Sequence, residues 1–296
     1  MINFNEYMMR PIIKSDREDI LFLINLFRLI KEKQDKVVYL DFKNTSFFAS
    51  ELYGFYHYMV DKLKAEGIDV IAKNVSEDVD RVNHLSEKYL LMNNLPSHSS
   101  IILPQNFCKD LENNNFDCFD NYMQKELLPK FISNDTVRNV ITQYLSELFV
   151  NSRTHGKTND ILCGGQKYNQ KNKIRIVVVD FGVTIPYNTE NHYIKGRNFY
   201  FHNNDGEAIR WATDMGTSTK DSLGGLGLNS IKEFIDTYSG KLLIISRYGS
   251  YERSRCRDKI FNSLNKFCGT FVVIELDLSE LNKIEKPKNS KEVLSI

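Results

Sequence analysis

The 296-residue sequence has few cysteines and almost no net charge. Its five cysteines, at positions 108, 118, 163, 256 and 268, are odd in number and form no Cys-x-x-Cys pair. Neither a disulfide framework nor a zinc site is therefore expected, and a reducing cytoplasm fits this content. The net charge of +1 gives no overall field that would favour nucleic acid or a membrane surface.

Long hydrophobic runs and targeting segments are also missing. The most apolar stretch, Ile20–Ile30, is interrupted by Asn25 and Arg28 and is too short to cross a membrane. The first residues, Met1–Glu6, lack the charged start and apolar run of a signal peptide. We therefore expect a cytoplasmic globular protein with no membrane partner, built as one large or two ordinary domains.

Hydrophobic patterns divide the chain near residue 95. Before that point helices and buried strands alternate, which predicts a small α/β domain over 1–95. We expect a connector or surface loop over 96–119, a second domain over 120–278 and a tail over 279–296. The predicted helices cover 15–34, 50–64, 77–91, 135–154 and 228–238, and the predicted strands cover 37–42, 69–72, 161–168, 173–180, 241–247 and 270–276.

A glycine-rich stretch, Asp214–Ile231, leads directly into a predicted helix. Glycine lets main-chain N–H groups line a concave turn, and a helix start adds unpaired N–H groups and partial positive charge. Together these features make an anion site, most often for phosphate. A flexible loop that ends in a glycine-rich helix cap accounts for the same residues, so this stretch alone leaves both interpretations open.

Three polar residues share one edge of the predicted helix over 135–154. Glu147, Asn151 and His155 are spaced at i, i+4 and i+8, which places them at the rim of the apolar side. Burying such groups without partners costs about 1–3 kcal/mol each, so a ligand, water or metal would satisfy them. The alternative is the ordinary boundary of a half-exposed helix, which we favour for His155 taken alone.

A carboxylate and a glycine end the predicted strand over 173–180. Asp180 could accept a hydrogen bond from an exocyclic amine, and Gly182 would let a flat ring approach the main chain. An ordinary turn, where Asp and Gly are common, is the alternative. Gly156-Lys157-Thr158 lacks the first glycine of a P-loop, and Asp180-Phe181-Gly182 lacks the other signatures of protein kinases.

These motifs follow one another in a recognisable order. Glu147-x-x-x-Asn151 precedes Asp180-x-Gly182, then the glycine-rich stretch, then Gly269-Thr270. This order resembles the ATP-binding domain shared by DNA gyrase, the ATP-dependent heat-shock chaperone, histidine kinases and MutL (GHKL), over roughly 120–278. The resemblance implies an α/β fold of the α+β two-layer sandwich type. In it a mixed β-sheet is covered on one face by helices, and ATP lies between the helices and a lid, here 187–215.

The resemblance also implies roles for single residues. Glu147 would orient or deprotonate the attacking water, and Asn151 would bind the Mg²⁺ that bridges the phosphates. Asp180 would bond the adenine amino group, with Gly182 beside the ring and Thr270 acting through water. The family's second glycine after this aspartate is Thr184 here, which we place in the nucleotide site. The loop that wraps the phosphates would contribute Ser218, Thr219, Lys220, Gly224, Gly225, Leu226, Gly227 and Leu228.

Two regions lie outside this resemblance. Residues 248–268 form an insertion with five basic residues: Arg253, Arg255, Arg257, Lys259 and Lys266. A solvated hairpin is expected there, and the alternative is a docking patch for an acidic partner or nucleic acid. Val38–Ser50 resembles the strand-to-helix turn of STAS domains, in which a serine at the helix start is phosphorylated. Ala49 replaces the expected aspartate, so no phosphorylation of Ser50 is expected.

The expected function is Mg²⁺-dependent ATP binding by a slow ATPase that acts as a nucleotide-gated switch. The alternatives are a protein kinase of the histidine-kinase or anti-sigma type, and an ATP-gated interaction module without turnover. No coiled-coil helix with an acceptor histidine precedes the second domain, which argues against a histidine kinase. Besides ATP, the expected partner is another protein, with a homodimer as a further alternative.

Overall fold

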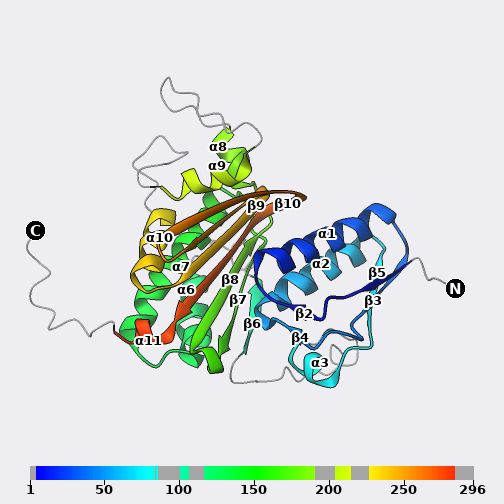
Figure 1. The fold of residues 1–296 in the computed structure, drawn as a ribbon, viewed down its shortest axis with the longest axis horizontal. Helices are drawn as coiled ribbons and strands as arrows, with labels where there is room; N and C mark the ends of the chain where they lie inside the picture. Colours follow the sequence, from blue (N-terminus) through cyan, green and yellow to red (C-terminus); the bar gives the residue numbers. More distant parts are fainter. Residues whose placement is uncertain are drawn as a thin grey trace, which may run out of the picture.

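Parallel strands and two long helices form the N-terminal part of the protein (Figure 1). The computed structural model describes residues 5–83, 85, 101–106, 117–190, 204–214 and 227–283. The N-terminal elements are β1 (Glu6–Met8), β2 (Ile12–Ile13), α1 (Arg17–Lys33), β3 (Val37–Asp41), β4 (Phe47–Phe48), a 3₁₀ turn (Ser50–Leu52), α2 (Tyr53–Ala65), β5 (Asp69–Lys73) and α3 (Glu77–Asn83). Strands β1, β3 and β5 pair in parallel in that order, and β2 pairs in parallel with β4.

The second part is built on a five-stranded sheet in the order β6-β7-β8-β10-β9. Its strands are β6 (Ile101–Asn106), β7 (Ile161–Tyr168), β8 (Lys173–Asp180), β9 (Lys241–Ser254) and β10 (Arg257–Asp277). The α+β sandwich expected from the sequence is confirmed. Each of the four strand pairings is antiparallel, whereas the sequence predicted a mixed sheet, and β6 lies in the segment expected as a connector.

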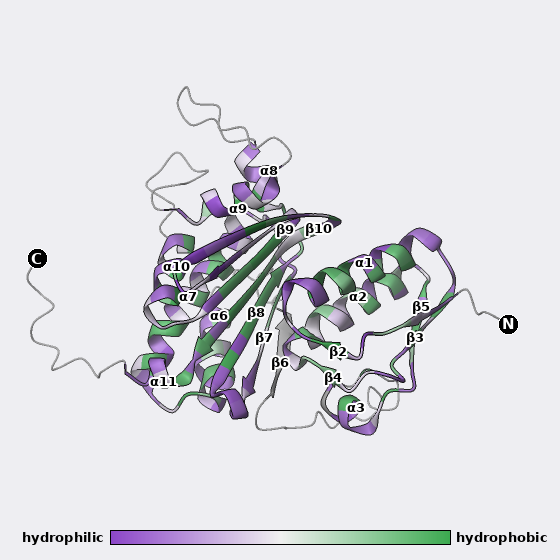
Figure 2. Cartoon of the chain, in the orientation of Figure 1, coloured by the Kyte–Doolittle hydropathy of each residue, from purple (hydrophilic) through white to green (hydrophobic). Residues whose placement is uncertain are grey.

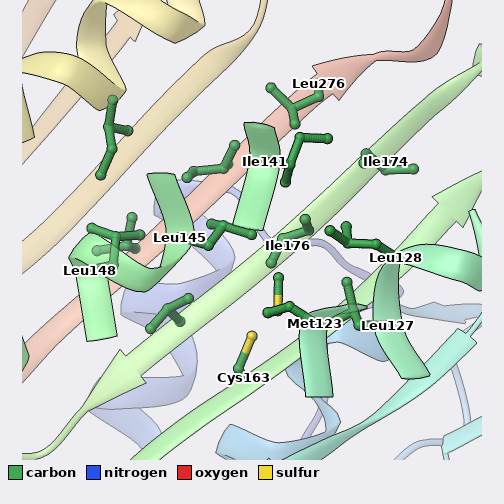
Figure 3. Close-up of a cluster of buried hydrophobic side chains, with 14 of the residues drawn as sticks. Met123, Leu127, Leu128, Ile141, Leu145, Leu148, Cys163, Ile174, Ile176 and Leu276 are labelled. Carbon is green, nitrogen blue, oxygen red and sulfur yellow. The ribbon is translucent and has the colours of Figure 1, made fainter. Parts of the chain in front are cut away.

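Helices cover one face of this sheet. They are α6 (Asp117–Tyr122), α7 (Asp135–Thr154) and α10 (Gly227–Thr237), with a π-helical turn (Met123–Leu127) and a 3₁₀ turn (Leu128–Lys130) after α6. The α7 helix begins where the Asn134 side chain accepts hydrogen bonds from Thr136 N and Val137 N. Its apolar side, with Ile141, Leu145 and Leu148, packs on the inward residues of β8 and β10 (Figure 3).

The opposite face of the sheet is covered by the N-terminal part. Along β8, Ile176 and Val178 lie in the core beneath α7, while Val177 and Val179 lie in a second core shared with α1 and α2. This alternation is the period of two of a strand, and it explains why the central strands are hydrophobic on both faces (Figure 2). The sheet is therefore buried on both sides.

Two short helices and a long hairpin lie at one end of the sheet. Helix α8 (Ile185–Glu190) follows β8, and α9 (Asp205–Ala212) packs on β9 (Figure 1). Strands β9 and β10 extend well beyond their predicted bounds, and α11 (Leu278–Leu281) closes the described part. Within the described ranges, no helix combines the length and the apolar character that a membrane crossing requires.

Candidate functional site

A cavity of about 120 Å³ lies between α7, the ends of the central strands, and helices α8, α9 and α10. Six of the residues predicted from the sequence line it, namely Glu147, Asn151, Asp180, Gly227, Leu228 and Thr270. His155, for which a helix boundary was the favoured interpretation, lines it as well. Other predicted residues lie outside the described part of the chain: Ser218, Thr219, Lys220, Gly224, Gly225 and Leu226.

Asp180 is the most deeply buried charged group of the cavity, with 4% of its surface exposed. It ends β8 between Ile161 of β7 and Thr270 of β10, its two partners across the sheet. Burial raises the pKa of Asp180 to about 6, and hydrogen bonds from Gly182 N, Ser152 and Thr270 oppose this rise. The carboxylate thus lies in a poorly solvated place, where a further donor would stabilise its charged form.

Ser152 is a site residue that the sequence analysis missed. Its Oγ lies 3.0 Å from Asp180 Oδ2 and 3.1 Å from the main-chain oxygen of Leu148. On α7 it continues the buried series Ile141, Leu145 and Leu148 at helical spacing. A serine within such an apolar series is the signal that could have identified it, because a buried hydroxyl needs a partner.

Gly182 and Thr184 are not among the described residues that line the cavity. A Cβ added at Gly182 would overlap the main-chain oxygen of Gly156, which also accepts a hydrogen bond from Val183 N at 2.6 Å. The glycine therefore lets the strand end approach the end of α7. The Thr184 hydroxyl instead accepts a hydrogen bond from Tyr187 N at the start of α8.

Glu147 lies against the first residue of α10. A Cβ added at Gly227 would overlap the Glu147 side chain, so any other residue there would displace the Glu147 carboxylate. The N-terminus of α10 carries unpaired N–H groups and a partial positive charge, which favour an anion. Glu147, Asn151 and Leu228 thus line the cavity from α7 and α10, and Asp180 and Thr270 line it from the paired strands β8 and β10.

The segment over 187–215, predicted to be an irregular lid, contains the last residues of α8 and the whole of α9. Both helices are tied to β9 by Arg247, which pairs with Glu190 of α8 and with Asp205 of α9. Tyr248 N also donates to Asp205 Oδ2 at 2.9 Å. Asn188, Thr189 and Trp211 from these helices line the cavity, and no periodic pattern over 187–215 indicated them.

The basic insertion over 248–268 forms the outer part of the β9–β10 hairpin. Arg253 is paired with Asp236 of α10 and with Asp258 across the hairpin. Arg255, Arg257, Lys259 and Lys266 are exposed. The hairpin form expected from the sequence is therefore confirmed, and one of its five basic residues is neutralised within the fold.

Two solved structures bear a distant likeness to the chain. No protein-family model matches the chain, and no curated protein does. Among solved structures, the ATPase region of Saccharomyces cerevisiae topoisomerase II is 13% identical, with 49% of this chain and 40% of that chain covered at a TM-score of 0.28. The same region bound to ICRF-187 (dexrazoxane) is also 13% identical, with 49% of this chain and 40% of that chain covered at a TM-score of 0.27. The chain thus spans about two fifths of these solved chains, and a likeness at this level carries no argument.

Proposed function

We propose that the cavity binds ATP and that the protein is a slow, Mg²⁺-dependent ATPase of the GHKL type, used as a nucleotide-gated switch. The observation that carries the proposal is the buried Asp180 carboxylate at the wall of the cavity, already bonded by Ser152 and Gly182. A buried carboxylate gains most from an additional donor, and the adenine amino group is such a donor. Val178, Ile244 and Val272 supply apolar wall for a flat ring.

The start of α10, which also lines the cavity, would suit a triphosphate. Gly227 and Leu228 begin α10 there, and its unpaired N–H groups and dipole favour phosphate oxygens. Among the described residues, no group of three or more His, Cys, Asp or Glu side chains is placed so that it could hold a metal ion. Mg²⁺ needs no such group, because it usually takes one or two protein oxygens together with phosphates and water. Asn151 would hold Mg²⁺ there, and bound Mg²⁺ would neutralise phosphate charge.

In this proposal the remaining groups have separate tasks. The Glu147 carboxylate orients the attacking water and accepts its proton, while Asp180 and Thr270 fix the base. Binding changes the positions of α8 and α9 and so what a partner protein can contact. We also propose that the chain consists of a first domain over 1–95, a connector over 96–119, a second domain over 120–278 and a tail over 279–296. Residues 101–106 of the connector join the sheet of the second domain.

Phosphate release and binding, measured on the purified protein with Mg²⁺ and radiolabelled ATP, test this function. We expect Glu147→Ala to abolish release and to keep ATP binding by calorimetry, because the carboxylate acts on water. Gly227→Ala should displace the same carboxylate and lower release about 100-fold without a loss of helix stability. The exposed Glu126→Ala serves as the control. Transfer of label to protein would instead support a kinase, and binding without release would support a non-hydrolysing module.

A further inference from the structure

The last residues of β8 face two different parts of the protein. Val178 and Asp180 lie on the face covered by α7, while Val179 and Phe181, the residue directly after β8, lie on the face covered by the N-terminal part. Because neighbouring residues of a strand alternate, one peptide unit joins the buried carboxylate of the cavity to a ring on the opposite face. A contact that fixes the Phe181 ring should therefore also restrict the position of Asp180.

Tyr58 of α2 holds this ring. The rings of Tyr58 and Phe181 are stacked, with centroids 3.8 Å apart and planes inclined by 19°. Phe267 adds an edge contact to Phe181, with centroids 6.0 Å apart. Phe181 is thus clamped between the N-terminal part and β10, and α2 supplies the closest aromatic contact.

The same tyrosine also holds the neighbouring strand end. The Tyr58 hydroxyl donates to Asp160 Oδ2 at 2.8 Å, and the main-chain oxygen of Asp160 accepts from Phe181 N at 3.2 Å. Asp160 immediately precedes Ile161, the residue paired with Asp180. Lys62, one turn further along α2, lies 3.5 Å from the same carboxylate. One side chain of the N-terminal part therefore contacts both strand ends that frame Asp180.

We propose that Tyr58 is a positioning residue for the Asp180 carboxylate, and that the N-terminal part thereby sets the selectivity of the cavity for adenine. This inference rests on the proposed nucleotide function. A displacement of about 1 Å at a recognising group is enough to lower binding or rate strongly, since hydrogen bonds are short and directional. Tyr58 is not among the described residues that line the cavity, and it contacts Phe181 and Asp160, so the phosphate side at Glu147 and Gly227 should be unaffected.

Calorimetry with ATP, with GTP and with inorganic triphosphate tests this role. GTP carries a carbonyl where ATP carries its amino group, and triphosphate has no base. We expect Tyr58→Leu to weaken ATP binding at least about tenfold and to reduce the preference for ATP over GTP. The affinity for inorganic triphosphate should stay within about twofold of the wild-type value. Tyr58→Phe keeps the stacked ring and loses the hydrogen bond to Asp160, so its ATP affinity should lie between those of the wild type and Tyr58→Leu. Tyr39→Leu, a half-buried tyrosine on β3 away from Phe181, should behave as wild type.

A ligand-free measurement separates this inference from the proposed function. The titration of the Asp180 carboxyl, followed by carbon NMR, should move by at least about half a pKa unit in Tyr58→Leu and stay unchanged in Tyr39→Leu. Equal losses for ATP and triphosphate, or an unchanged ATP preference with an unchanged titration, would overturn the role of Tyr58. Wild-type protein that binds neither ATP nor triphosphate would overturn the nucleotide function itself.

Discussion

In the proposed function, recognition of the base depends on Asp180, and the protonation of this carboxyl should control binding. Its pKa of about 6 in the folded protein lies above the ordinary value of 3.8. Between these values the unfolded chain ionises this carboxyl while the folded chain keeps it protonated. The carboxyl therefore favours the folded state below about pH 4, and this contribution is lost as the pH rises to about 6.

ATP affinity should consequently change in the opposite sense. The ionised carboxylate is the better acceptor for the adenine amino group, so affinity should rise about tenfold between pH 5 and pH 7. Because ATP itself titrates in this range, the control is Asp180→Asn. This variant should bind ATP more weakly, and its affinity should show only the smaller change with pH that comes from ATP. Calorimetry at several pH values measures both. Parallel pH profiles for the two proteins would remove Asp180 from base recognition.

Elements with a strong local pattern were predicted well from the sequence. The helix over 135–154 and the strands over 161–168 and 173–180 are confirmed as α7, β7 and β8, because each has a clear apolar pattern and α7 also has a polar N-cap. Helix α9 was not predicted. It has eight residues and is fixed by distant groups, notably Arg247, that no local window contains.

The residues of the candidate site likewise differ in whether a local sequence pattern indicates them. Glu147, Asn151 and Asp180 carry local signals, namely a helical spacing and a strand end, and the structure brings all three to one cavity. The tasks of Gly182 and Ser152 depend on how closely the end of α7 approaches β8. That distance is a property of tertiary packing, so the sequence alone could not supply it.

The ion pairs of Arg247 should stabilise the element pair α8 and α9. The side chain of Asp205 is only 5% exposed, so removing Arg247 would leave a buried, uncompensated charge. We expect Arg247→Ala to lower the free energy of unfolding by about 3 kcal/mol, measured by urea denaturation. Arg255→Ala, at the exposed hairpin turn, should change it by less than about 0.5 kcal/mol. Equal unfolding midpoints for the two variants would contradict this account.

At the scale of the whole molecule, the sheet and the N-terminal part share one core, and we expect the two parts to unfold together. This core combines residues of α1 and α2 with Val177, Phe271 and Val273 of the sheet. Phe55 of α2 is 2% exposed and contacts the ring of Phe271, with centroids 5.3 Å apart. A core shared in this way transmits a loss of packing in one part to the other.

Unfolding measured by two probes tests this cooperativity. Trp211 is the one tryptophan of the chain and lies at the cavity, whereas far-ultraviolet circular dichroism reports on both parts. Phe55→Ala should lower the free energy of unfolding by about 3–5 kcal/mol and shift both transitions together, because one core spans the sheet. The exposed Met8→Ala should shift neither. If Trp211 fluorescence kept its wild-type midpoint while circular dichroism showed an earlier step, the two parts would be independent, and a signal from α2 could not reach Asp180 through packing.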